Sequence, residues 1–101
     1  MLISTPVDVI KVLADPQREL LIERLTNGPA CTCHLVDETG LKQPTVSHHL
    51  KVLREAGVVE AEPHGRYTYY RLVPASLDAA AEHVARLAER ARDTANERRE
   101  C

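Results

Sequence analysis

A short break between two segments with helical character constrains the fold of this chain more than any other feature. The first segment, Cys31 to Thr39, is closed by Gly40, a residue type that suits the left-handed end of a helix. The second segment opens at Gln43-Pro44, and proline is favoured in the first turn of a helix. We therefore expect two helices joined by a tight turn rather than one long helix.

The second of these helices is expected from Pro44 to Glu55 and is amphipathic. Val46, Leu50 and Leu53 lie at i, i+4 and i+7, which places them in one apolar stripe with His49 at its edge. The opposite face is polar. Two helices joined in this way form a helix-turn-helix motif, which we expect over about residues 33–56.

A β-hairpin is expected directly after this pair of helices. Val58 to Glu62 and Tyr67 to Val73 are rich in β-branched and aromatic residues, as strands are. His64-Gly65 between them suits a tight turn. A hairpin in this position is a wing, which we place over about residues 58–73.

Helices are also expected after Thr5-Pro6 and Asp15-Pro16, and a long final helix runs from Pro74 to about Arg98. Its small and apolar residues follow heptad spacing: Leu77, Ala81, Val84, Ala88, Ala91 and Ala95. We expect a mainly α chain with a hairpin wing (α+β), in the order α-α-α-α-β-β-α. A single winged-helix domain over residues 1–101 is expected to form a homodimer through helices at about 6–14 and 75–98.

Charge and composition narrow the function classes only slightly. The 101-residue chain has a net charge of −2, but between Lys42 and Arg71 five cations stand against three anions. A weakly basic middle is therefore flanked by acidic ends, which by itself is only a weak sign of DNA binding. No apolar run reaches the roughly 18 residues that span a membrane, and the N-terminus lacks the features of a secretion signal. We expect a cytoplasmic protein.

The run GLKQPTVSHHLKVLREAGVV, residues 40–59, resembles the ArsR/SmtB family of winged helix-turn-helix metalloregulatory repressors at nearly every position. The wing HGRYTYYRL, residues 64–72, resembles the same family, and the similarity covers about residues 8–75. This resemblance implies a homodimeric repressor that binds double-stranded operator DNA and releases it when an inducer binds. It implies no enzyme activity, and the chain has no glycine-rich phosphate loop.

A recognition helix must present short polar side chains to base edges and cations to phosphates. The candidates for the major groove are Gln43, Thr45, Ser47 and His48. The candidates for phosphate contact are Lys42, Lys51 and Arg54, and Arg66 at the wing tip could enter the minor groove. His49 is expected to pack at the edge of the core. The wing tyrosines, Tyr67, Tyr69 and Tyr70, are expected to pack the wing rather than stack on bases.

Two cysteines at the start of the first helix of the motif form a second candidate site. Cys31 and Cys33 match the Cys-x-Cys of the arsenic-responsive members of the family, whereas His34 replaces the Asp that follows. Thiolates select soft, thiophilic ions, and a helix N-terminus favours the thiolate form. The resemblance therefore implies As(III) or a related thiophilic ion as the inducer.

The sequence does not identify the third ligand for such an ion. As(III) in this family is typically held by three thiolates, and Cys101 is the third cysteine of the chain. It lies at the end of the long helix, however, so an exogenous thiol, water or His34 are alternatives. Some relatives carry a second metal site between the final helices of a dimer, but the residues available for one here are expected to form a solvated face: Asp78, Glu82, His83 and Glu89.

Other functions remain open beside arsenic sensing. The same thiols could sense oxidants or persulfides, or they could bind Cd(II), Zn(II) or Pb(II). They could also be small buried hydrophobic residues without a ligand. A pure metal buffer is disfavoured by the intact DNA-reading helix. An enzyme with Cys33 as nucleophile is disfavoured because nothing in the sequence resembles an oxyanion hole.

Overall fold

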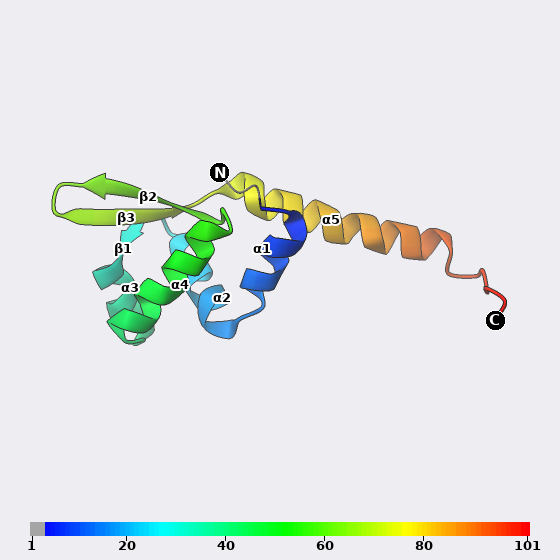
Figure 1. Cartoon of the computed structure of the whole chain (residues 1–101), viewed down its shortest axis with the longest axis horizontal. Helices are drawn as coiled ribbons and strands as arrows, with labels where there is room; N and C mark the ends of the chain where they lie inside the picture. Colours follow the sequence, from blue (N-terminus) through cyan, green and yellow to red (C-terminus); the bar gives the residue numbers. More distant parts are fainter. Residues whose placement is uncertain (1–3) are drawn as a thin grey trace.

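The computed structural model describes residues 4–101. Five helices and three short strands follow one another in these residues (Figure 1). Their order is α1 (Pro6–Leu13), α2 (Pro16–Leu25), β1 (Ala30–Cys31), α3 (Thr32–Thr39), α4 (Gln43–Glu55), β2 (Val59–His64), β3 (Tyr67–Leu72) and α5 (Pro74–Asp93). The predicted winged helix-turn-helix is confirmed, with α3 and α4 as the motif and β2 and β3 as the wing.

The helix starts follow from side chains that cap them. Thr5 accepts a hydrogen bond from the backbone N–H of Asp8, and the Asp8 carboxylate accepts one from the N–H of Thr5. Asp15 accepts hydrogen bonds from the N–H groups of Gln17 and Arg18, so α2 starts directly after α1 ends. Gly40 ends α3 with a φ of 74°, a conformation that disfavours any residue with a side chain.

The core is aliphatic and lies where α2, α3 and α4 meet the base of the wing. Its largest fully buried side chains are Leu21, Leu35, Leu50, Leu53, Val46, Val58 and Val59. Leu21, Ile22 and Leu25 of α2 are buried, and α2 packs against α1, α3 and α4. The motif therefore rests on a helix that is itself fixed by the first helix of the chain.

The sheet contains one strand more than the sequence predicted. β3 lies between β1 and β2, and both pairings are antiparallel. In β1, Cys31 pairs with Tyr69 and Ala30 with Tyr70, so the residues just before α3 are joined to the wing. The expected helix start at Cys31 is therefore wrong by one residue, because Cys31 is the helix N-cap and completes the strand.

The wing is a hairpin with a two-residue turn. His64 pairs with Tyr67, so the turn consists of Gly65 and Arg66, and β2 runs two residues further than expected. Gly65 has a φ of 63°, and no residue other than glycine in the described part of the chain has a positive φ. A glycine at the first turn position is typical of the type II′ turns that match the twist of hairpins.

The last helix projects away from the other elements (Figure 1). Its first half packs against α1, but Val84 and Leu87 further along are each 51% exposed. The Cα radius of gyration is 17.0 Å, whereas a compact chain of this length has about 13 Å. The predicted helix end near Arg98 is wrong because α5 ends at Asp93, where no packing supports the polar residues that follow. No helix within residues 4–101 is long and apolar enough to cross a membrane.

Candidate DNA-binding surface and thiol cluster

The polar face of α4 points outward because its apolar face is fully buried. Val46, Leu50 and Leu53 are at most 1% exposed, which confirms the predicted stripe. The residues predicted to contact DNA lie elsewhere on the helix, and all of them except the half-buried Thr45 are exposed: Gln43, Ser47, His48 and Lys51. The structure thus presents one surface of short polar and cationic side chains to solvent.

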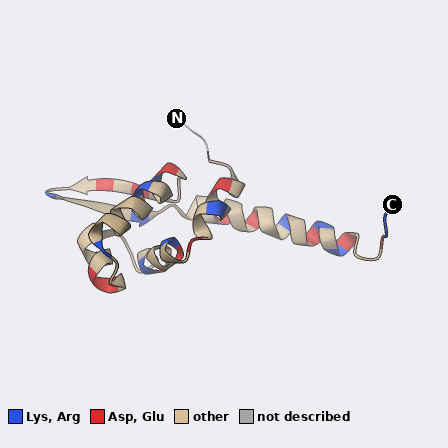
Figure 2. Cartoon of the chain, turned by 60° about the horizontal axis from the view of Figure 1, so that its bottom comes forward, with Lys and Arg blue, Asp and Glu red and all other residues tan. Residues whose placement is uncertain are grey.

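The wing adds a cation beyond the end of this helix. Its tip is blue in Figure 2, and the charged residue in the turn is the exposed Arg66. Of the wing tyrosines, Tyr69 and Tyr70 are half-buried, as expected for side chains that pack the wing. The same expectation is wrong for Tyr67, which is 59% exposed at the start of β3. Tyr67 is therefore available to solvent next to Arg66.

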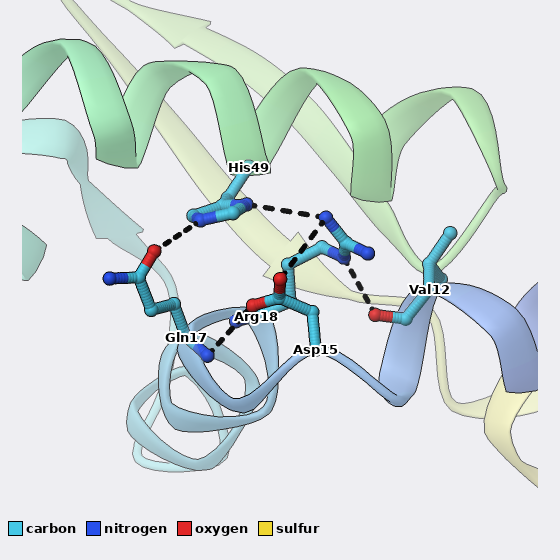
Figure 3. A network of polar contacts seen from close by, with 5 residues as sticks. All are labelled: Val12, Asp15, Gln17, Arg18 and His49. Atoms are coloured by element: carbon cyan, nitrogen blue, oxygen red, sulfur yellow. Dashed lines mark hydrogen bonds and ion pairs between the residues drawn. The ribbon is translucent and has the colours of Figure 1, made fainter.

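A buried histidine connects α4 to the two helices before it (Figure 3). His49 is 6% exposed, which confirms that it packs at the core edge rather than facing solvent. Its Nε2 lies 2.8 Å from Oε1 of Gln17, and its Nδ1 lies 3.4 Å from Nη1 of Arg18. The Nε of Arg18 also donates to the carbonyl oxygen of Val12 across 2.7 Å, so the network reaches the end of α1.

The partners of His49 determine its protonation state. A guanidinium can only donate hydrogen bonds, so Nδ1 accepts from Arg18 and Nε2–H donates to the amide oxygen of Gln17. The imidazole is therefore neutral. Burial lowers the pKa of His49 below its usual value, nearby Asp15 opposes this shift, and Arg18 and His48 add to it. Protonation would place two positive groups in contact.

The thiol cluster lies at the junction of β1 and α3. Cys31 is 4% exposed, whereas Cys33 and His34 are exposed. The Nδ1 atom of His34 accepts the backbone N–H of Cys31 at 3.2 Å and lies 3.3 Å from its Sγ. The two Sγ atoms and a ring nitrogen of His34 all lie within 4.8 Å of one another. This is the one group of at least three possible metal ligands in residues 4–101.

The two thiols differ in how readily they ionise. Burial raises the pKa of Cys31, but hydrogen bonds from the Cys33 thiol and from the N–H groups of His34 and Cys33 outweigh it, so the pKa lies below the usual value. The pKa of Cys33 is raised, chiefly because its thiol donates to Cys31, and burial and the Cys31 charge add to this. Cys31 is thus the first thiolate of the pair.

A cleft joins the thiol cluster to the predicted DNA-binding surface. It has a volume of about 340 Å³, and Cys31 and Cys33 line one side of it. Gln43 of α4 and Arg66 of the wing, both predicted DNA contacts, line the same cleft. A ligand on the two thiols would therefore lie next to groups that are predicted to face DNA.

The third cysteine lies elsewhere in the chain. Cys101 is exposed, and the C-terminus lies at the far end of the long axis from β1 and the wing (Figure 1). Within one subunit the structure brings Cys31 and Cys33 together with His34 and not with Cys101. A contact from Cys101 would have to come from a second subunit, and its role as a ligand stays a prediction.

Two features of these sites were not predicted from the sequence. The network around His49 was missed, although the stripe of α4 contained the signal, since the spacing from Val46 to Leu53 places His49 at its edge. A histidine in such a position needs polar partners. His34 was named as an alternative third donor, but its contact with Cys31 was missed. That contact was detectable, because His34 stands three residues after the N-cap residue Cys31, where a side chain can return to the cap.

Comparison with known proteins assigns the chain to a family. Residues 15–61 match the model of the arsR family of bacterial regulatory proteins. An arsenic resistance transcriptional regulator of Pseudomonas putida is 45% identical over 71% of this chain and 57% of its own length. An arsenical resistance operon repressor of Staphylococcus xylosus is 36% identical over 69% of this chain and 67% of its own length.

A solved structure agrees with the fold. A homodimeric winged helix-turn-helix DNA-binding domain from Mycobacterium bovis, a possible ArsR-family transcriptional regulator, has a TM-score of 0.63 and 32% identity. The comparison covers 93% of this chain and 81% of that one. Among the curated relatives, the chain spans between 48% and 75% of their length. The family match, the relatives and the winged fold together show that this chain belongs to the arsR family of bacterial regulatory proteins.

Proposed function

We propose that this protein is a transcriptional repressor that binds operator DNA as a homodimer and releases it when a thiophilic ion binds Cys31 and Cys33. As(III) or a related soft ion is the inducer. The observation that carries the proposal is the cleft that both thiols share with Gln43 and Arg66. Such a regulator works in the cytoplasm, where DNA is accessible and thiols stay reduced.

The DNA-binding part of the proposal rests on the exposed surface of α4 and the wing. Ser47 and His48 present donors and acceptors for base edges in the major groove, with Gln43 and Thr45 at the helix start. Lys51, which is exposed, is proposed to contact a phosphate. Arg66 at the wing tip is proposed to enter the adjacent minor groove, where a narrow A·T tract attracts cations.

The dimer rests on α5 and on its contact with α1. The exposed Val84 and Leu87 form an apolar strip on a helix that leaves the body of its own subunit. The opposite face is charged and carries the Glu82–Arg86 ion pair. A second copy would cover the strip, and the Mycobacterium bovis relative is itself homodimeric. Two recognition helices would then read half-sites about one DNA turn apart.

The route from ion to DNA passes through the strand β1. Cys31 pairs with Tyr69 of the wing, and it is also the N-cap of α3. An ion that draws the two thiols together must move Cys31 or the first turn of α3. Either movement acts on the wing through the backbone pairing of β1 with β3, and on α4 through α3. The DNA contacts of Arg66 are thereby changed.

Fluorescence anisotropy on reduced protein tests this proposal. A duplex is first selected from a random library by repeated binding to the protein, and arsenite, Cd(II) or Zn(II) is then titrated against the complex. We expect one or more ions to weaken binding by about 5- to 150-fold, the usual size of an allosteric coupling. Cys31→Ser and Cys33→Ser should bind the duplex like wild type and no longer respond.

Thr32→Ser is the matched control, because it changes the residue between the thiols and leaves both of them in place. It should respond like wild type. If a variant with both thiols replaced by serine still leaves DNA on addition of the same ion, the site is not Cys31 and Cys33. If no duplex sequence is enriched over random DNA, the protein is not a sequence-specific repressor.

A redox- or persulfide-sensing repressor is the second candidate. It is favoured by the lowered pKa of Cys31 and by the exposed Cys33 two residues away, which could resolve an oxidised Cys31. In the same assay, peroxide or a persulfide donor would release DNA without any ion, and a reductant would restore binding. Release by ions alone would exclude this candidate.

A further inference from the structure

We propose that His34 is the third protein ligand of this site, so that a Cys₂His donor set holds a divalent, four-coordinate ion of the Zn(II) or Cd(II) class. The inference rests on the proposed function only in taking Cys31 and Cys33 as ligands. It adds a residue to the site and narrows the inducer to one chemical class. A fourth coordination position stays open to solvent.

The distances fit one ion. Zn–S bonds of about 2.3 Å and Zn–N bonds of about 2.0–2.1 Å in a tetrahedral site place neighbouring ligand atoms roughly 3.5–3.8 Å apart. Sγ of Cys31 lies 3.3 Å from Nδ1 of His34, and all three ligand atoms lie within 4.8 Å of one another. Small side-chain movements would bring the three donors to coordination distance, and Nδ1 of His34 would then exchange its hydrogen bond from the Cys31 N–H for the ion.

The start of α3 explains why these side chains meet. Cys31 is the N-cap residue and His34 stands three residues later, the spacing at which a side chain returns to the cap. Because Nδ1 of His34 accepts the N–H of Cys31, this nitrogen carries the lone pair and the proton is on Nε2. The atom that a metal ion needs is thus already turned toward the thiol of Cys31.

The imidazole is also held from the side of the wing. The ring centroids of His34 and Tyr69 are 6.2 Å apart with the planes tilted by 53°, a separation at which aromatic rings attract. Tyr69 is the residue that pairs with Cys31 across the sheet. The same strand therefore positions two of the three ligands, and an ion on them would restrain the wing.

Access and ligand chemistry define the class of ion. Cys33 and His34 are exposed, so an ion can enter from solvent and keep one position for water or an external ligand. Two thiolates and an imidazole suit borderline-soft divalent ions, because imidazole is a good ligand for them and thiolates bind them strongly. As(III) lacks its third thiolate within the subunit, since Cys101 lies at the other end of the molecule.

The test compares His34→Asn with wild-type full-length protein under reducing conditions. Asparagine keeps an acceptor for the N–H of Cys31 but removes the imidazole, so the helix start is preserved. Zn(II) and Cd(II) affinities are measured by competition with a chromophoric chelator, and arsenite affinity by intrinsic thiolate absorbance. We expect Zn(II) and Cd(II) to bind at least tenfold more weakly and arsenite to bind within about twofold of wild type.

Spectroscopy gives a readout that does not depend on DNA release. Co(II) substituted into the wild-type site should show the absorption bands of a tetrahedral ion with thiolate ligands. X-ray absorption on the Zn(II) form should show two sulfur neighbours with the remaining ones nitrogen or oxygen. In His34→Asn the imidazole scattering should disappear while both sulfur neighbours remain. His83→Asn on α5 is the matched control and should change nothing.

Each outcome decides the inference. Unchanged Zn(II) and Cd(II) affinity in His34→Asn would show that His34 is not a ligand. An equal loss of arsenite affinity would show that the variant only disturbs the thiols, which also overturns it. A different result would contradict the proposed function: Cys31→Ser and Cys33→Ser would then keep wild-type ion affinity or ion response.

Discussion

The Nε2 of His49 donates a hydrogen bond of 2.8 Å to Oε1 of Gln17, and this bond ties the recognition helix α4 to the start of α2. On its other side, Nδ1 of the same ring accepts from Arg18, which holds the last turn of α1 through the carbonyl of Val12. Three helices thus meet at one neutral imidazole (Figure 3). Because α1 packs against α5, the network also links the DNA-reading helix to the proposed dimer surface.

Acidification should therefore destabilise the fold through His49. Burial keeps its folded-state pKa below the usual value, so the unfolded chain takes up the proton first as the pH falls. The contribution is complete above the ordinary histidine pKa of about 6.5 and declines below it, by at most about 1.4 kcal/mol per pH unit, until folded His49 itself protonates. Urea unfolding between about pH 7.5 and pH 5, the range that brackets the ordinary histidine pKa, measures this slope.

The variant His49→Leu isolates the effect. It removes the titrating group from the buried site, so the free energy of unfolding should vary less with pH than in wild type. His83→Gln on α5 is the control and should keep the wild-type slope. Equal slopes for wild type and His49→Leu would show that His49 does not carry the pH dependence.

Removal of single side chains from the outer face of α4 should weaken specific DNA binding. Ser47→Ala and His48→Ala are each expected to cost about 1–3 kcal/mol on the selected duplex if the side chain reads a base edge. Both residues are exposed, so their thermal unfolding should match wild type. Asn27→Ala, exposed in the loop after α2, serves as the control in the anisotropy assay. Wild-type affinity in both α4 variants would remove this surface from the interface.

The wing tip should contribute to DNA binding mainly through its positive charge. Arg66→Ala is expected to lower affinity for the selected duplex. It should also reduce the slope of log Kd against log salt by about 1 for each phosphate that Arg66 neutralises. Arg66→Lys keeps the charge and should preserve most of the slope. An unchanged slope in Arg66→Ala would show that the wing tip does not displace counterions from DNA.

The sequence predicts those parts of this fold that depend on local periodicity. The stripe of Val46, Leu50 and Leu53 followed from helical spacing, and the wing from its composition and turn. β1 could not be predicted, because two residues carry no periodicity and their pairing with Tyr69 and Tyr70 joins distant parts of the chain. The early end of α5 was equally hidden, since it reflects the absence of packing and not a helix-breaking residue.

The candidate sites likewise contain some features that the sequence predicts and others that it does not. Cys31 and Cys33 stand out by their spacing, but the position of His34 beside them depends on Cys31 being the N-cap. His49 was correctly placed at the core edge, whereas its partners Gln17 and Arg18 come from another helix and leave no local signal. The sequence analysis thus misses partners that come from another helix, and it misses a local contact where it places the helix start one residue early.

Charge on the apolar strip of α5 should prevent dimer formation. Leu87→Glu places a carboxylate on a surface that a second subunit would bury, and sedimentation velocity at micromolar concentration should then show a monomer with weaker DNA binding. Glu89→Lys changes the charge on the opposite face of the helix and should leave the dimer intact. A wild-type protein that sediments as a monomer would contradict the dimer itself.

Whether Cys101 binds an ion depends on how the two subunits of the dimer are arranged. Its distance from Cys31 within one subunit means that it can reach an ion only from a second subunit, across a dimer in which the end of α5 passes the other wing. With His34 as third ligand, Cys101→Ser should leave Zn(II) and Cd(II) affinity and DNA release unchanged. X-ray absorption of the arsenite complex is the sharper measurement, because a third sulfur neighbour in wild type that disappears in Cys101→Ser would place this thiol in the site. Mixed dimers of Cys101→Ser with Cys31→Ser subunits would then retain one complete site if Cys101 acts between two subunits, and none if it acts within one.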